Sequence, residues 1–361
     1  MALNFPDPAG QTPVNTFSPT STPNASTNGV TYVWDTEKWV AADAATFLPI
    51  GGGTLTGDLA VPSLNGGPLA GYRNAIINGD FRIWQRGTSI DVVSGGSNYT
   101  ADRWRVANPG AIQAVSRQNS TLPGFAYEAS FNTALGSIYQ GVELDRLGSA
   151  EPFTPGSTWT FSCWAGYQDI SAADFVVRFG GAAVGGGVDI TPVFNGPFGA
   201  AVETAPNSWG KYVVTFSIPN PLAFAANPRF LEVILPGGAA LGGLIRYTGC
   251  QLEPGPVATP FEHRPIGTEL ALCQRYYLVG ENRVQNSSFD TGYVSNWLAF
   301  PVLMRAAPDL TSTVTLKVPP NVDDPTVYVT DFGVIFSSKN VTGSDIPNHS
   351  LAVDFTADAE L

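Results

Sequence analysis

Few residues of this chain could carry out acid–base or nucleophilic chemistry. His263 and His349 are the only histidines. His263 stands between Glu262 and Arg264, and no Gly-x-Ser-x-Gly turn provides the serine nucleophile of a hydrolytic triad. We therefore expect His263 to have a structural role.

Two pairs of carboxylates could support glycan cleavage, namely Glu143 with Asp145 and Asp323 with Asp324. Alternate residues of a strand share a face, with side chains about 6–7 Å apart, and glycosidases place two carboxylates beside the bond that they cleave. An acidic β-protein contains such pairs by chance. The sequence therefore predicts no enzyme active site, with glycan cleavage as an alternative.

Donors for a metal ion are scattered. The aspartates that could supply oxygen ligands follow no EF-hand spacing, and we expect them to be surface acids: Asp189, Asp323, Asp324 and Asp331.

Three cysteines cannot all pair, and they form no Cys-x-x-Cys motif: Cys163, Cys250 and Cys273. We expect buried thiols in a protein made in a reducing cytoplasm.

Exposed aromatic side chains are another means of binding a ligand. A sugar ring stacks on an aromatic face while polar neighbours orient its hydroxyl groups. A single tryptophan is more often part of a core, and aromatic residues in a loop or at the start of a strand are better placed. We therefore select three glycan-binding candidates: Tyr293, Trp297 and Trp209.

The composition indicates what kind of fold must position these residues. The 361 residues suit two or three domains, and 43% of them are hydrophobic, enough to fill real cores. Charged residues make up 13%, against about 25% in a typical soluble domain. Turn residues, including 39 Gly and 29 Pro, separate short apolar runs, as in β-sandwiches and barrels. The predicted fold class is all-β.

Charge and hydropathy disfavour two kinds of partner. The net charge is −12 and no patch of Lys and Arg is present, so we expect no binding to nucleic acid. No window approaches about 18 consecutive apolar residues, so we expect no membrane insertion. Residues 1–10 contain neither a basic region nor an apolar core, which predicts synthesis in the cytoplasm without a signal peptide.

The chain divides into five predicted segments. Residues 1–48 form a small module with a β-hairpin over 29–40, followed by an extended, glycine-rich linker over 49–72. A β-sandwich of about ten strands follows at 73–266, and its clearest strands are 158–167, 174–179, 211–218 and 229–235. In the first of these, alternation predicts one buried face and one partly exposed face.

A short helix and a second β-domain complete the prediction. Thr268 is the expected cap of a helix over 267–276, with Glu269 in its first turn and Arg275 in its last. The C-terminal β-domain covers 277–361, with strands predicted at 297–304, 310–318, 326–336 and 351–356.

Six segments resemble parts of one protein family. In chain order they are 48–59 (LPIGGGTLTGDL), 73–87 (RNAIINGDFRIWQRG), 99–104 (YTADRW), 251–264 (QLEPGPVATPFEHR), 269–277 (ELALCQRYY) and 300–308 (FPVLMRAAP). They resemble segments of tail fibre proteins of tailed bacteriophages. The first resembles a spacer of trimeric fibres, and the next three resemble a sandwich similar in layout to carbohydrate-binding jelly rolls.

The resemblance implies a homotrimeric fibre on the virion surface. The module 1–48 would dock to other virion proteins, 49–72 would trimerise, and the jelly-roll-like sandwich would face a host-surface polysaccharide. Jelly rolls of this kind often hold a structural calcium ion, for which Asp80 is the candidate ligand. Thr248 stands where a second aspartate is expected, and this departure disfavours the ion.

Three functions are compatible with these expectations. The first is non-catalytic attachment of a virion to a host-surface glycan through a tail fibre. An alternative is a purely structural capsid-decoration or collar fibre with the same fold. The third is a glycan depolymerase, which would need two acids placed across a cleft.

Overall fold

The chain adopts the predicted all-β fold, with a short helix, α2. In the computed structural model, the described residues are 16–17, 32–34, 39–41 and most of 72–360, with gaps at 108–112, 132–135, 145–152, 183–187, 220–229, 238–240, 242, 287–292, 319–324 and 340–348. The chain separates into two compact units, residues 1–61 and 62–361, and each is described by itself.

The first unit contains a three-stranded antiparallel sheet in the order β1-β2-β3. β2 (Tyr32–Trp34) and β3 (Trp39–Ala41) form the predicted hairpin. β1 (Thr16–Phe17) pairs with β2 in a polar, proline-rich stretch whose sequence does not indicate a strand. Of the predicted linker 49–72, all but Tyr72 lies outside the described residues.

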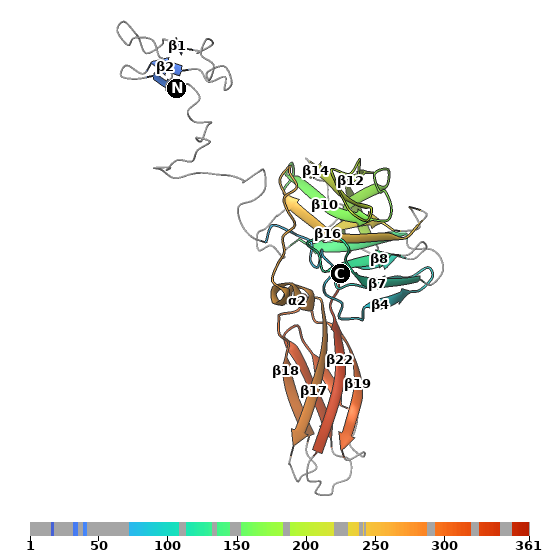
Figure 1. Cartoon of the computed structure of the whole chain (residues 1–361). Helices are drawn as coiled ribbons and strands as arrows, with labels where there is room; N and C mark the ends of the chain where they lie inside the picture. Colours follow the sequence, from blue (N-terminus) through green and yellow to red (C-terminus); the bar gives the residue numbers. More distant parts are fainter. Residues whose placement is uncertain are drawn as a thin grey trace. The chain divides into compact units, whose positions relative to one another are not determined.

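Two antiparallel sheets form the sandwich of the second unit (Figure 1). The first has the order β13-β14-β10-β16-β8-β7-β4, with bounds Glu203–Ala205, Trp209–Ser217, Thr158–Gly166, Ile245–Pro254, Tyr127–Phe131, Gln113–Asn119 and Ser89–Val92. The second has the order β12-β11-β15-β9-β6-β5, with bounds Val188–Pro197, Asp174–Ala182, Phe230–Pro236, Ser137–Glu143, Arg105–Ala107 and Ser97–Tyr99. The sequence underestimates the number of strands because three strands, β5, β6 and β13, have only three residues each, too few to show an alternation.

Aromatic side chains fill the space between the two sheets. Phe161 of β10 and Phe175 of β11 stack with ring centroids 4.6 Å apart, and Phe198 packs 5.2 Å from Phe175. Burying one such side chain contributes roughly 1.5–3 kcal/mol to folding. This core fixes the strands whose ends carry the site described below.

The outer face of strand β10 is partly exposed at Thr158 and Trp164, as predicted, but it is buried in the middle of the strand. The odd-numbered residues from Trp159 to Cys163 face the core, as predicted. Thr160 and Ser162 point the other way and are nevertheless 0% and 3% exposed. The segment after β16 covers this outer face, and the Thr160 hydroxyl donates to the carbonyl oxygen of Gly255 at 2.7 Å. Alternation could not reveal a cover made by a loop.

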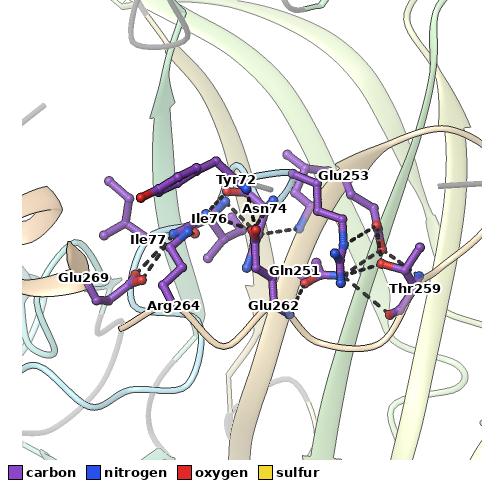
Figure 2. A network of polar contacts seen from close by, with 12 residues as sticks. Tyr72, Asn74, Ile76, Ile77, Gln251, Glu253, Thr259, Glu262, Arg264 and Glu269 are labelled. Carbon is purple, nitrogen blue, oxygen red and sulfur yellow. Dashed lines mark hydrogen bonds and ion pairs between the residues drawn. The ribbon is translucent and has the colours of Figure 1, made fainter. Parts of the chain in front are cut away.

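A buried polar network holds the beginning of the sandwich against its end (Figure 2). The backbone N–H of Asn74 donates to Glu262 at 2.9 Å, and the Asn74 side-chain oxygen accepts from the N–H of Leu252 at 3.0 Å. These residues belong to 73–87 and 251–264, two of the segments that carry the phage resemblance. In this chain, the two segments therefore close the sandwich by joining its beginning to its end.

Helix α2 (Ile266–Gln274) lies where a helix is predicted. The prediction of its cap is wrong: Pro265 is the N-cap, no side chain caps the helix, and Thr268 lies inside the first turn. Glu269 is in the first turn, as predicted, but it is buried and pairs with Arg264 at 3.3 Å. Packing and this ion pair therefore anchor a helix that is too short to be stable alone.

The C-terminal domain consists of two three-stranded antiparallel sheets (Figure 1). One has the order β17-β22-β19, with bounds Tyr277–Asn286, His349–Asp358 and Asp309–Val318. The other has the order β18-β21-β20, with bounds Tyr293–Ala299, Gly333–Lys339 and Thr326–Val329. The prediction of one strand over 326–336 is wrong because a turn divides it: the N–H of Thr330 donates to the carbonyl oxygen of Gly333 at 2.9 Å. The strand predicted at 297–304 is β18, which ends at Ala299.

Buried charges join the sandwich to the C-terminal domain within the second unit. Arg103 is 1% exposed, forms an ion pair with Glu360, and has its guanidinium 3.5 Å from the ring centroid of Tyr276. Arg275, the C-cap of α2, pairs with Glu143 at 3.0 Å. None of the described helices has the length and hydropathy needed to cross a membrane.

Candidate functional site

A groove of about 420 Å³ lies where strand β10 ends and strand β14 begins. Its walls are the loop after β10, strand β13 and the turn between β13 and β14. Tyr167, Asn207 and Ser208 in these turns have positive φ angles of 75°, 63° and 61°. Non-glycine residues rarely adopt this conformation, and they cluster at functional sites when they do. The volume lies within the range of about 300–1,000 Å³ that is usual for small-molecule sites.

Tyr167 provides an aromatic surface in the groove. Its side chain is 49% exposed, and the guanidinium of Arg246 lies 4.3 Å from its ring centroid. Arg246 is itself held by an ion pair with Glu128, whose side chain is completely buried. The ring is therefore fixed from one side by a cation, while half of its surface remains accessible.

Asp169 provides a fixed negative charge two residues farther along. Its carboxylate accepts hydrogen bonds from the backbone N–H of Ser171 at 2.9 Å, from the Ser171 hydroxyl at 3.1 Å and from the Tyr212 hydroxyl at 3.0 Å. The hydrogen bond from the Ser171 N–H is the main cause that lowers the pKa of Asp169 below its usual value. Burial raises the pKa of Tyr212, so this hydroxyl keeps its proton and remains a donor. Asp169 is thus an ionised acceptor in a set orientation.

Trp209, a predicted glycan-binding residue, lines the groove but is only 1% exposed. Its indole N–H donates to the hydroxyl of Thr121 at 3.0 Å. A Cβ atom on Gly166 would lie 3.1 Å from its ring, so the indole packs closely on the backbone of β10. Trp209 therefore shapes the floor of the groove and presents no ring face to a sugar.

Trp297, the second candidate, lies on the outer face of the sheet β18-β21-β20. It is 49% exposed and pairs with Ile335 of β21, which in turn pairs with Tyr328 of β20. Tyr328 is 60% exposed, and Ile335 is half-buried. We call the row Trp297, Ile335 and Tyr328 the aromatic platform. Tyr293, the third candidate, begins β18, and its side chain lies outside the described residues.

The predicted catalytic candidates are not brought together. Glu143 is held by Arg275 and by the hydroxyl of Tyr276 at 2.9 Å, and its expected partner Asp145 lies outside the described residues. The pair at 323–324 lies outside them too. The ring of His263 packs against two phenylalanines, with centroid distances of 5.3 and 4.9 Å: Phe125 and Phe261.

The calcium candidate does not fit a cation in this arrangement. Asp80 forms an ion pair with Arg82 at 2.5 Å, so a positive charge already occupies its carboxylate. The hydroxyl of Thr248 donates to the carbonyl oxygen of Tyr127 at 2.9 Å. Across the described residues, no three His, Cys, Asp or Glu side chains gather to hold a metal ion.

The three cysteines are buried thiols, as predicted: Cys163, Cys250 and Cys273. Burial raises the pKa of the Cys250 and Cys273 thiols well above the usual value. Because the thiolate is the reactive form, these two residues have a structural role.

The sequence does not single out Tyr167 and Asp169. Tyr167 ends a predicted strand, and Asp169 follows it in a short polar segment. The sequence pattern that could have indicated this site is an aromatic residue at the end of a strand, followed by Gln and Asp. It is a weak signal, because Arg246 and Tyr212, which fix the two side chains, are distant in sequence.

Comparison with known proteins gives similarity at the level of structure alone. No protein-family model matches the chain. No curated protein matches it. Among solved structures, the enzymatically active domain of tailspike protein 4 from bacteriophage CBA120 is 13% identical over 52% of this chain and 22% of that chain, with a TM-score of 0.29. This chain thus covers about a fifth of the tailspike structure.

Two other solved structures illustrate the range of these similarities. The CBM22-1 xylan-binding domain from Paenibacillus barcinonensis Xyn10C is 12% identical over 46% of this chain and 99% of that chain, with a TM-score of 0.26. A cyclase from Fischerella sp. is 11% identical over 48% of this chain and 99% of that chain, also with a TM-score of 0.26.

Proposed function

We propose that this chain is a non-catalytic carbohydrate-binding protein and that the groove holds the sugar. One observation carries the proposal: the half-exposed ring of Tyr167, fixed by Arg246, lies beside the ionised carboxylate of Asp169 in a groove of about 420 Å³. An apolar surface with a few oriented polar groups is the usual composition of a small-molecule site.

Both halves of a sugar have a partner in this groove. The C–H bonds of a pyranose face carry partial positive charge and meet the negative face of the Tyr167 ring. Asp169 already accepts three hydrogen bonds, and a carboxylate has about four acceptor positions, so one remains for a sugar hydroxyl. Gln168 and Thr204 also line the groove and add side-chain donors and acceptors.

The charge of the groove favours a neutral glycan. Its described lining includes the carboxylate of Asp169 and no Lys or Arg. Arg246, behind Tyr167, is neutralised by Glu128. An acidic sugar would therefore meet a like charge without a compensating cation, which disfavours binding.

We propose further that the protein is a virion surface fibre that attaches a phage to a host-surface polysaccharide. The six segments that resemble tail fibres support this proposal, and the spacer-like segment 48–59 is one of them. The fibre is a homotrimer with the module 1–48 attached to other virion proteins. Three copies of one weak groove raise the overall affinity through effective concentration.

The test of the groove is binding of the full chain to an array of neutral and acidic bacterial polysaccharides. Tyr167→Ala is expected to weaken binding to neutral glycans by about tenfold or more, because it removes the stacking surface. Tyr127→Ala is the matched control, since Tyr127 stacks on Arg117 at 4.4 Å outside the groove, and it should bind as the wild type does.

Four results would contradict these proposals. Equal loss in both tyrosine variants would indicate damage to the fold rather than to the groove. A preference for acidic glycans would refute the neutral ligand class, and release of shorter sugars from the polysaccharide would refute the non-catalytic role. In light scattering, a mass near 38.1 kDa rather than about three times that value would refute the trimer.

A further inference from the structure

The outer face of the sheet β18-β21-β20 carries a row of large side chains that the proposed groove does not use. The strand register places Trp297, Ile335 and Tyr328 side by side across the three strands. The opposite face of the same strands packs into the core through Val334 and Phe336. The aromatic platform is therefore the solvent side of a half-buried sheet.

The ring of Trp297 is held in place by backbone. A Cβ atom on Gly333 would lie 2.7 Å from Cζ2 and 3.0 Å from Cη2 of the indole, so the benzene part of the ring lies against Gly333. The side chain is nevertheless 49% exposed. Trp297 therefore rests against the neighbouring strand while much of its surface remains accessible.

The spacing of the two aromatic residues suits an extended chain of sugars. Neighbouring strands are about 4.8 Å apart, so Trp297 and Tyr328, separated by one strand, stand about 10 Å apart. Ile335 fills the position between them. A continuous apolar row of this length can contact consecutive sugar rings of one chain.

Hydroxyl groups flank this row on the same face. Two residues along each strand, Ser295 pairs with Ser337, and Ser337 pairs with Thr326. The hydroxyls of Ser295 and Ser337 are 2.7 Å apart and share a hydrogen bond. This second row supplies uncharged donors and acceptors for sugar hydroxyls, next to the apolar row that receives the ring faces.

The extent of the apolar row favours a glycan over a protein as its occupant. A stable protein interface buries about 800 Å² on each partner, with a continuous apolar core. Here the apolar surface is one row wide, and the rows beside it are Ser, Thr, Ala and Gly: Ser295, Ser337, Thr326, Ala299 and Gly333. None of these side chains is charged, which matches a neutral polymer.

We propose that the aromatic platform is a second carbohydrate-binding surface, which takes an extended, neutral polysaccharide lying across the three strands. The ligand class rests on the proposed function, but the surface is separate from the groove and can be tested separately.

The test uses the full chain with microcrystalline cellulose and chitin powders, two neutral polymers that expose flat sugar faces. Trp297→Ala and Tyr328→Ala are each expected to weaken binding by about tenfold or more. Val279→Ala is the matched control, because Val279 is another exposed apolar residue of this domain, 49% exposed on β17, and it should bind as the wild type does. Unchanged thermal unfolding confirms that each variant is folded.

Each outcome separates the two surfaces. If Trp297→Ala and Tyr328→Ala bind like the wild type while Tyr167→Ala loses binding, the platform is refuted and the groove stands. If the wild type binds neither powder, the platform is refuted, and the groove is still tested by the soluble array. If Trp297→Ala lowers the solution mass of the protein, the platform is a contact between copies of the chain, and the inference is overturned.

Discussion

The groove of the sandwich and the aromatic platform of the C-terminal domain both combine an exposed aromatic ring with hydroxyl groups, but they are built differently. The groove is concave and is formed by turns at strand ends, with Tyr167 and Asp169 as its main groups. The platform is flat and is formed by strand faces, with Trp297 and Tyr328 as its aromatic residues.

The two surfaces also orient their rings by different forces. Tyr167 lies on a guanidinium that depends on an ion pair with Glu128. Trp297 lies against the backbone of Gly333 and needs no charge. Solvent ions screen charge pairs, whereas close packing is insensitive to salt and pH. We therefore expect the groove, and not the platform, to respond to the salt concentration.

The largest expected effect concerns the link that holds both surfaces in one unit. Arg103 is buried between the domains, pairs with Glu360, and donates to the carbonyl oxygen of Gly141 at 2.6 Å. Removing one partner of a buried ion pair leaves an uncompensated charge and costs about 3–5 kcal/mol. Arg103→Ala should therefore lower the free energy of unfolding by that amount in denaturant titration.

The control for this variant is Arg283→Ala. Arg283 pairs with Glu281 at 2.5 Å, but its side chain is 71% exposed, so its removal should leave the unfolding curve unchanged.

In Arg103→Ala we also expect the two domains to unfold in separate steps. A single transition with the wild-type midpoint would show that the buried pair does not couple them.

A smaller effect is expected from the charge of Asp169. Asp169→Asn removes the anion and should weaken groove binding by about tenfold, since hydrogen bonds to charged groups contribute about 1.5–3 kcal/mol. The lowered pKa means that the carboxylate stays ionised down to pH values below 3.8, the ordinary value for aspartate. Groove binding by the wild type should therefore stay constant as pH falls to about 4 and decrease only below it.

The platform provides the internal comparison for this pH experiment. Binding to chitin through Trp297 should not change over the same pH range, and Asp169→Asn should remove the pH dependence of groove binding. A decrease of groove binding at pH 5 to 6 would contradict the assignment to Asp169. It would indicate a group with a higher pKa.

The groove and the platform also differ in how far their residues can be predicted from the sequence. Trp297 could be selected as an aromatic residue at the start of a predicted strand; it lies near the end of β18 instead, and it is exposed as expected. Tyr167 could not, because its accessible ring depends on Arg246, which lies on another strand and was not linked to it by any pattern. Trp209 was selected for the same reasons as Trp297, yet Thr121 and Gly166 enclose it. The all-β fold and most strands followed from local patterns, whereas loop coverage and long-range ion pairs did not.

The smallest expected effect is the coupling between the two surfaces. The groove and the platform lie on different domains, and the residues described for them do not overlap. For a short oligosaccharide, the losses of binding free energy caused by Tyr167→Ala and Trp297→Ala should therefore add within about 0.5 kcal/mol. A polysaccharide long enough to reach both surfaces adds the gain of simultaneous binding, which either variant removes. Each single variant should then lose more affinity for the long chain than for the short one in calorimetric titrations. Equal losses for both lengths would show that one glycan chain does not bind groove and platform at the same time.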